Sequence, residues 1–344
     1  MSVKNMMISK IKEINYEKLD KLASDIAARN NKSKGYVKRD MIKNFIKYGI
    51  GYTDYLKGDY INLTKKQKET YVTTKSFYKI LAYLNNPKYI SCMNDKLLFN
   101  KIFKDYLKRD FLDLRTSSSD DLKAFAKGKE HIFAKPPKDF GGHGIRKIKV
   151  KDIKDYDKLY KELRSKEINL IEDEIIQHPE VSKLNPFAVN SFRIVTLLDK
   201  NCKPHILANA LRINLDDSAA IGCSDAFMRL NEKGEICSRV VDDIANVYEE
   251  HPLTGIKFNT VKVPYVKEAF DLALKAALEV PEIRYVGWDI AITKDGPVIM
   301  EGNEYPSYGV IQYYLFNDEH VGHLKQLNDI LGDELKDLKL WKDS

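Results

Sequence analysis

The sequence predicts an α+β fold preceded by a helical N-terminal region. Residues 1 to about 90 place apolar side chains at helical spacing and show no strand alternation. From about residue 130, short β-type runs alternate with helices instead. A chain of 344 residues is also too long for one compact core, and a prior of roughly 150 residues per domain gives two or three units.

The N-terminal helices are indicated by two sets of apolar residues three and four positions apart. These sets are Ile8, Ile11, Ile14, Leu19 and Leu22, and then Met41, Ile42, Phe45 and Ile46. A further amphipathic helix is predicted over 95–107, with Asn94 or Asp95 as its cap. The polar run TSSSDD at 116–121 is typical of a linker and marks a candidate boundary.

The second part of the chain contains the predicted strands. They are 131–135, 145–150, 170–176, 191–198, 205–213, 286–293 and 298–302, with helices near 155–164 and 266–278. Residues 216–264 carry few periodic signals, so mostly loops and short strands are expected there.

The composition, 43% hydrophobic and 31% charged, is that of an ordinary soluble globular chain. No apolar run approaches the ~18 residues of a transmembrane helix, and the N-terminus lacks the pattern of a signal peptide, so we expect a cytoplasmic protein. The net charge of +7 rests mostly on scattered lysines, which favours a solvated surface over a nucleic-acid partner. Four cysteines in four separate segments argue against a zinc site or disulfide framework, and no heptad pattern reveals an oligomeric state.

The most informative segment is a predicted β-hairpin whose two apolar strands flank residues 294–296. A three-residue loop with glycine at the left-handed position suits this sequence. If Thr293 lies opposite Pro297, the register places Asp289 directly opposite Glu301.

Three oxygen-bearing side chains then share one face of the hairpin, because Asn303 lies two residues beyond Glu301. The other face carries Ile290, Ile292, Val298 and Met300. Opposed carboxylates repel unless a positive group lies between them, and a few oxygen donors with room for water and phosphate suit Mg²⁺. Separate bonds of Asp289 and Glu301 to lysines or backbone groups are the alternative.

A second candidate site is a glycine-rich loop after the predicted strand 131–135. Gly141, Gly142 and Gly144 follow Lys135 within FAKPPKDFGGHGIRK. Clustered glycines let backbone N–H groups approach a phosphate, and the lysine could neutralise a phosphate oxygen. The spacing matches neither the P-loop nor GxGxxG, so a plain flexible hairpin turn is the alternative.

A third candidate is the end of the predicted strand 170–176. Glu172, Asp173 and Glu174 lie there, before an apolar pair formed by Ile175 and its neighbour. A strand edge of this kind could offer backbone donors and acceptors to a flat heterocycle. Taken alone, it is merely an acidic strand end.

Two arginines, Arg193 and Arg212, lie inside otherwise apolar predicted strands. Burying an arginine is costly unless it meets a carboxylate or a phosphate. Both are therefore candidates for an anion site, and structural salt bridges are the alternative.

In chain order, these features resemble the ATP-grasp superfamily of ligases, and most closely the sugar-transfer-associated ATP-grasp family, which is alpha-L-glutamate ligase-like. The resemblance covers roughly residues 95–309 and includes a D…ExN hairpin and the strings IIQHPE and NPFAVNSFRIVTLL. It implies the ATP-grasp fold, in which two α/β lobes hold ATP between antiparallel sheets. We accordingly expect a helical region over 1–90 and an ATP-grasp domain over 91–344, with a small lobe at about 120–180 and a large lobe at about 185–330.

The resemblance also implies a role for each candidate residue. The ATP-binding set is Lys96 and Lys135 at the phosphates, Gly141, Gly142 and Gly144 in the closing loop, Glu172, Asp173, Glu174 and Ile175 at the adenine, and Glu180 at the ribose. The magnesium ligands are Asp289, Glu301 and Asn303, with two ions expected, and the catalytic cations are Arg193 and Arg212.

The implied enzyme is a carboxylate–amine ligase that forms carbon–nitrogen bonds and uses ATP and Mg²⁺. ATP phosphorylates the carboxylate, and the amine then attacks the acylphosphate. The expected partners are a small-molecule or sugar-linked carboxylate and an amine, in cell-surface polysaccharide or sugar-conjugate biosynthesis. The alternatives are a phosphotransferase of the same fold and a non-catalytic module that binds a polyanion.

Two regions depart from the family pattern. Residues 220–235 lack the glycine-rich stretch with aspartate and asparagine that relatives carry, and the first ninety residues contain no interpretable motif. The sequence therefore identifies neither the carboxylate nor the amine.

Overall fold

The computed structural model describes residues 16–138, 144–217, 225–316, 320–338 and 340. Its strands are β1 (Phe111–Asp113), β2 (His131–Lys135), β3 (Arg146–Lys149), β4 (Leu170–Asp173), β5 (Ser191–Leu198), β6 (Pro204–Asn214), β7 (Asp225–Met228), β8 (Val240–Asp242), β9 (Val247–Tyr248), β10 (Tyr285–Thr293) and β11 (Gly296–Asn303).

Helices precede, connect and follow these strands. The α-helices are α2 (Tyr16–Arg29), α3 (Lys34–Tyr48), α4 (Tyr52–Lys57), α5 (Lys65–Lys68), α6 (Thr74–Leu84), α7 (Ser91–Asn94), α8 (Lys96–Ile102), α9 (Lys104–Leu107), α10 (Ser119–Ala126), α11 (Tyr156–Ser165), α12 (Pro179–Ser182), α13 (Val266–Ala276), α14 (Tyr308–Ile311) and α15 (Leu324–Leu331). The short 3₁₀ segments are η1 (Val150–Asp152), η2 (Phe258–Thr260), η3 (Tyr314–Phe316) and η4 (Gly332–Leu338).

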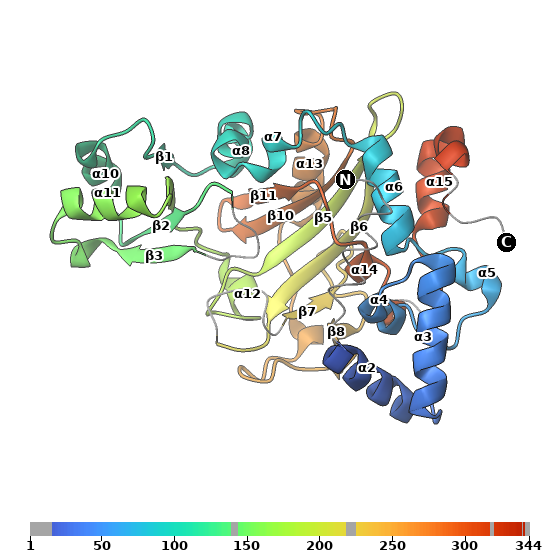
Figure 1. Cartoon of the computed structure of the whole chain (residues 1–344). Helices are drawn as coiled ribbons and strands as arrows, with labels where there is room; N and C mark the ends of the chain where they lie inside the picture. The colour runs from blue at the N-terminus through green and yellow to red at the C-terminus, as the bar shows by residue number, and fades with distance from the viewer. Residues whose placement is uncertain (1–15, 139–143, 218–224, 317–319, 339, 341–344) are drawn as a thin grey trace.

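The strands form two antiparallel sheets, which confirms the predicted α+β class. The smaller sheet has the strand order β1-β4-β2-β3, and the larger has the order β11-β10-β5-β6-β7-β8-β9. Figure 1 shows the smaller sheet with α10 and α11 at one end of the molecule, the larger sheet in the centre, and α2–α4 toward the other end.

The strongly apolar strands were predicted well, and the polar connection before α10 was not. Residues 116–121 are not a linker, because Ser118 caps α10 and forms a reciprocal capping box with Asp121. The same polar residues that indicate a loop also stabilise a helix start. The predicted helix over 95–107 is broken at Phe103 into α8 and α9.

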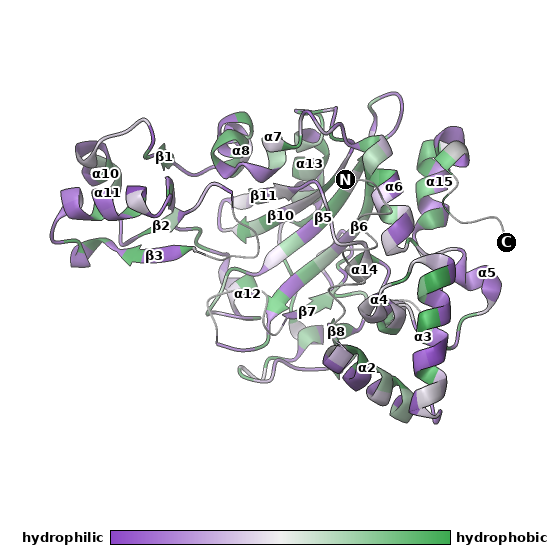
Figure 2. Ribbon diagram, in the orientation of Figure 1, coloured by the Kyte–Doolittle hydropathy of each residue, from purple (hydrophilic) through white to green (hydrophobic). Residues whose placement is uncertain are grey.

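Three apolar cores pack against the larger sheet. Alternate residues of a strand point to opposite faces, so one strand contributes to two of these cores. On β5, Phe192 and Ile194 pack in a core with α13, whereas Val195 and Leu197 pack in a second core with α6 and α15. A third core joins α2–α4 to β7 and β8. Figure 2 shows that α6 and α15 carry both hydrophobic and hydrophilic residues, as expected for helices that cover a sheet.

The described N-terminal helices therefore share their buried cores with the strands of the larger sheet. Likewise, β1 belongs to the smaller sheet although it precedes residue 120. The division at residues 90, 120–180 and 185–330 stays a prediction. Ile8, Ile11 and Ile14 lie outside the described residues. Among the described residues, no helix is long and apolar enough to cross a bilayer.

Replacing Ile80 with alanine tests this shared core. Ile80 of α6 is fully buried against residues of β5, so Ile80→Ala should lower the free energy of unfolding by about 2–5 kcal/mol. Urea unfolding followed by circular dichroism would measure the change. Ile46→Ala is the control, because Ile46 is 72% exposed on α3. A separate early transition of the N-terminal helices, with the main transition unchanged, would contradict the shared core.

Candidate active site

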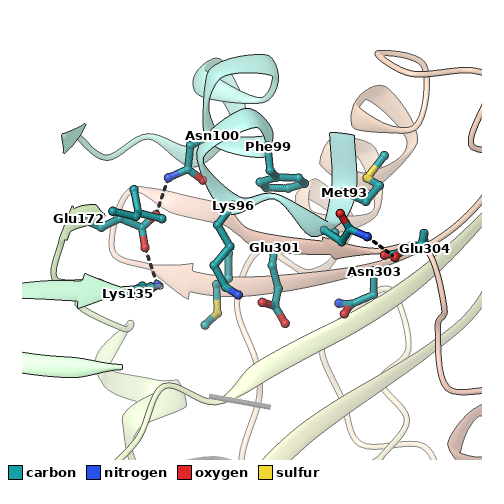
Figure 3. A pocket seen from close by; sticks show the side chains of 13 residues that line it. Met93, Lys96, Phe99, Asn100, Lys135, Glu172, Glu301, Asn303 and Glu304 are labelled. Carbon is teal, nitrogen blue, oxygen red and sulfur yellow. Dashed lines mark hydrogen bonds and ion pairs between the residues drawn. The ribbon is translucent and has the colours of Figure 1, made fainter. Parts of the chain in front are cut away.

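A pocket lies where the two sheets meet, between α7–α8 and β11. Its lining residues are Met93, Asn94, Lys96, Phe99, Asn100, Lys135, Leu170, Glu172, Met300, Glu301, Gly302, Asn303 and Glu304. Figure 3 shows Lys96 extending from α8 toward the β11 side chains, with Lys135 and Glu172 on the side of the smaller sheet. The pocket thus brings together residues from both sheets that the sequence indicated separately.

The hairpin that carries Glu301 turns more tightly than predicted. Thr293 lies opposite Gly296 rather than Pro297. Gly296 has φ +104°, a backbone conformation that favours glycine. The tight turn shifts the register by one residue as far as the pair of Ile290 and Ile299.

A β-bulge at Met300 then restores the predicted register. Beyond it, Asp289 lies opposite Glu301, as the sequence predicts. The predicted facing of Val298 and Met300 was wrong. Val298 lies opposite Ala291 and Met300 lines the pocket, while Ile299 packs with Ile290 in the core. A bulge inserts one extra residue into a strand and so turns every later side chain to the other face.

Asp289 is held by a two-point ion pair with Arg193 of the neighbouring strand. Arg193 donates from Nε to Oδ1 at 2.5 Å and from Nη2 to Oδ2 at 2.8 Å. Gly287 makes room for this approach, because a Cβ there would lie 3.2 Å from Cδ of Arg193 and 2.8 Å from Cβ of Pro306. Burial raises the pKa of Asp289, but Arg193 outweighs it and holds that pKa below its usual value.

The pKa of Glu301 is shifted in the opposite direction from that of Asp289. Burial, followed by the negative charge of Asp289, raises the pKa of Glu301, while Arg193 and Lys96 lower it only in part. Asn303 donates from Nδ2 to Oδ2 of Asp289 at 3.3 Å. This site therefore holds more carboxylate charge than Arg193 alone compensates.

A divalent cation fits this set of donors. Carboxylate and amide oxygens are hard ligands, and three of them leave positions for water and phosphate oxygens, as Mg²⁺ prefers. Across the described residues, no group of three or more His, Cys, Asp or Glu side chains could hold a metal ion. The predicted set of Asp289, Glu301 and Asn303 therefore depends on its amide oxygen.

Lys96 reaches the pocket from the start of α8. Asp95 caps this helix by accepting from the N–H groups of Leu97 and Leu98. The backbone N–H of Lys96 donates to the carbonyl of Pro137 at 2.9 Å, which ties α8 to the segment after β2. The segments that carry Lys96 and Lys135 are thus linked by a backbone hydrogen bond.

Glu172 is the centre of a buried charge network that sequence reasoning missed. Its side chain is 2% exposed, forms an ion pair with Lys135, and accepts from Nη2 of Arg109 at 2.8 Å and from Nδ2 of Asn100 at 2.7 Å. Burial alone would raise the pKa of Glu172, but Lys135 and then Arg109 hold it far below the usual value. No local sequence pattern indicated a role for Arg109, because its partners lie far away in the sequence.

The chain crosses from the smaller to the larger sheet through residues 174–176. β4 ends at Asp173, before the predicted end of this strand, and Gln177 already bridges to Thr293 of β10. Within the described part of the chain, the backbone N–H groups of 174–176 donate to no backbone carbonyl.

The charged side chains of this crossing make ion pairs within the smaller sheet. The carboxylate of Glu174 lies 2.9 Å from Nδ1 of His131 and 2.6 Å from Nζ of Lys147. Asp173 pairs with Lys129. The carboxylates of Asp173 and Glu174 therefore already have partners within the smaller sheet.

Several predicted residues that the structure describes do not line the pocket, namely Asp173, Glu174, Ile175, Glu180, Arg193, Arg212 and Asp289. Arg212 pairs with Asp225 of β7, although its charge also helps to lower the pKa of Asp289. Glu180 lies on α12, where its partly exposed side chain pairs with Lys183.

In the predicted glycine loop, Gly141 and Gly142 lie outside the described residues. Gly144 is exposed, with φ +74°.

The family model described as sugar-transfer associated ATP-grasp matches residues 60–326 of the sequence. No curated protein matches it. Among solved structures, the ATP-grasp ligase PsnB with a minimal precursor is 14% identical, with a TM-score of 0.44, over 73% of this chain and 64% of that one. This chain thus covers less than two thirds of PsnB.

Two further solved structures are similar. The D-alanine–D-alanine ligase of Bacillus anthracis is 14% identical, with a TM-score of 0.39, over 73% of this chain and 70% of that one. The N5-carboxyaminoimidazole ribonucleotide synthetase of Thermotoga maritima is 10% identical, with a TM-score of 0.38, over 67% and 48%.

Replacing Glu172 with glutamine tests the buried network. The change leaves Arg109 and Lys135 without their carboxylate, so Glu172→Gln should lower the free energy of unfolding by about 3–5 kcal/mol. Because the folded pKa of Glu172 is lowered, its contribution is complete above the unfolded pKa, near 4.5, and is lost as the pH falls below it. Urea unfolding should therefore show a flatter pH dependence for Glu172→Gln below about pH 4.5.

Glu180→Gln is the matched control, because it breaks an exposed pair worth less than about 1 kcal/mol. Equal losses for the two variants would contradict a special role for the buried network.

Proposed function

The chain belongs to the sugar-transfer associated ATP-grasp family, and from this premise we propose that it is an ATP- and magnesium-dependent ligase that joins a carboxylate to an amine. The observation that carries the proposal is the shared pocket. Glu301 and Asn303 line the same pocket as Lys96 and Lys135, so two proposed oxygen ligands of a metal ion share a pocket with two lysines proposed to bind phosphates.

The proposed ATP position follows the pocket from one sheet to the other. Lys96 and Lys135 would hold the phosphates, and the crossing from Asp173 to Ile175 would meet the adenine through its backbone. Leu170 and Met300 line the same pocket and offer apolar surface to a flat ring. The loop with Gly141, Gly142 and Gly144 is proposed to close over the phosphates, and Glu180 to bind the ribose.

The proposed magnesium ligands are Asp289, Glu301 and Asn303. An ion bound there would neutralise charge on the phosphates of ATP. The family resemblance implies two ions. The raised pKa of Glu301 supports this position, because a cation relieves the repulsion between two facing carboxylates.

The proposed reaction has two steps. An oxygen of the substrate carboxylate attacks the γ-phosphorus of ATP, and the bond to the β-phosphate oxygen breaks, so ADP leaves and an acylphosphate forms. The amine then attacks the acyl carbon, the carbon–oxygen bond breaks, and phosphate departs with that electron pair while the nitrogen loses one proton to water or phosphate. The product is an amide.

The protein's part is positioning and charge stabilisation, which dominate phosphoryl transfer. Arg193 pairs with Asp289 through Nε and Nη2, so its Nη1 is the atom that would face a transferred phosphoryl group. Arg212 is the proposed second cation on the same sheet, one strand further along. Exclusion of water by the closed loop would protect the acylphosphate from hydrolysis.

The proposed substrates are a small-molecule or sugar-linked carboxylate and an amine, and the proposed role is in cell-surface polysaccharide or sugar-conjugate biosynthesis. The family's association with sugar transfer supports this class. Because ATP is the proposed co-substrate, the proposed place of action is the cytoplasm.

An ADP-release screen tests this function. The purified chain, with ATP and Mg²⁺, should form ADP only when a carboxylic acid and an amine are both present, in panels of uronic acids, amino acids and simple amines. Mass spectrometry should then find an amide that lacks one water relative to the two substrates. A stable phosphorylated product formed without an amine would indicate a phosphotransferase instead. Salt-sensitive binding of a polyanion without ATP binding would indicate a non-catalytic module.

A further inference from the structure

Arg109 joins the smaller sheet to the strand that carries Glu301. We propose that Arg109 is a positioning residue that holds the bulge at Met300 and so keeps Glu301 on the same face as Asp289. This inference rests on the proposed function, because it assigns Arg109 to the support of the proposed magnesium site.

The contacts of Arg109 are made to the bulge itself. Its Nη1 donates to the carbonyl of Ile299 at 2.7 Å, and its Nη2 donates to the carbonyl of Met300 at 3.2 Å. The side chain is only 5% exposed. One planar guanidinium therefore binds the two consecutive carbonyls at which the strand departs from regular pairing.

The bulge decides which way Glu301 points. Between Thr293 and Ile290, the register pairs each residue with a partner one position earlier than beyond the bulge. If that register continued, Met300 would lie opposite Asp289, and Glu301 would turn to the opposite face of the sheet. The site would then lose one of its two carboxylates.

The same guanidinium binds the carboxylate that engages Lys135. Arg109 donates to Oε1 of Glu172 from Nη2 at 2.8 Å and from Nε at 3.2 Å, and Glu172 pairs with Lys135. Arg109 therefore fixes the proposed phosphate-binding lysine and the proposed metal ligand relative to each other. A lysine could not replace it, because an ammonium group lacks the planar fork that spans a carboxylate and two carbonyls.

The test compares Arg109→Lys with Arg115→Lys. Arg109→Lys keeps a positive charge near Glu172 but cannot hold both carbonyls. Arg115 is the matched control, because it also makes a two-point bond to a buried carboxylate, with its Nε 2.9 Å from Oδ1 and its Nη2 2.8 Å from Oδ2 of Asp113, and it does not line the pocket. The readouts are Mn²⁺ binding in the presence of ADP, measured by electron paramagnetic resonance, and hydrogen exchange of the β10–β11 amides.

Arg109→Lys should weaken Mn²⁺ binding by about tenfold or more, which is typical when a residue supporting a metal ligand is lost, and should speed exchange around Met300. Arg115→Lys should change neither readout. Unchanged Mn²⁺ affinity and unchanged exchange in Arg109→Lys would overturn the proposal.

Deleting Met300 separates the register from other effects of Arg109. The deletion removes the extra residue, so the regular ladder itself would place Glu301 opposite Asp289. Combined with Arg109→Lys, the deletion should return Mn²⁺ affinity to within about threefold of the unsubstituted chain, which is well inside the tenfold loss. An equal loss with and without Met300 would overturn the proposal, because Arg109 would then act through Glu172 alone.

The proposed function can fail separately. If the unsubstituted chain binds no Mn²⁺ in the presence of ADP, the metal site is wrong. The exchange of the hairpin amides then decides the role of Arg109: faster exchange in Arg109→Lys supports it, and unchanged exchange overturns it.

Discussion

Two carboxylates lie opposite each other across β10 and β11, and this like-charge pair is the constraint on which the site depends. Asp289 is kept charged by Arg193, whereas Glu301 has its pKa raised by burial and by Asp289. Opposed like charges destabilise a sheet, so a fold that buries them needs a positive group between or beside them. Arg193 is one such group in the structure, and a divalent cation is the second that we propose.

The rest of the pocket follows from how the two sheets are joined. Glu172, on the smaller sheet, forms ion pairs or hydrogen bonds with Lys135, Arg109 and Asn100. Arg109 in turn donates a hydrogen bond to the backbone of β11. A buried carboxylate needs such partners to offset its loss of hydration. Lys135 on one side of the pocket and the strand that carries Glu301 on the other are therefore connected by an ion pair and hydrogen bonds, and not only by proximity.

Much of the fold could be predicted because β5, β6, β10 and β11 are apolar and long. The opposition of Asp289 and Glu301 was predicted correctly, although two unforeseen features produce it. The hairpin turns one residue earlier than expected, and a bulge at Met300 compensates. The bulge has no local signal, because Met300 fits an apolar strand in either register.

One missed feature, the Arg109 network, depends on contacts between segments that are distant in the sequence. Arg109 bonds to Glu172, Ile299 and Met300, and no spacing rule connects these positions. The 116–121 run was misread as a linker because capping residues and loop residues are the same types.

The proposed magnesium site, the central claim, is tested most directly by calorimetric titration of ADP with and without Mg²⁺. Mg²⁺ should strengthen ADP binding to the unsubstituted chain and to Asp295→Asn, an exposed change at the tip of the same hairpin, but not to Glu301→Gln. An equal effect of Mg²⁺ on all three proteins would contradict the claim.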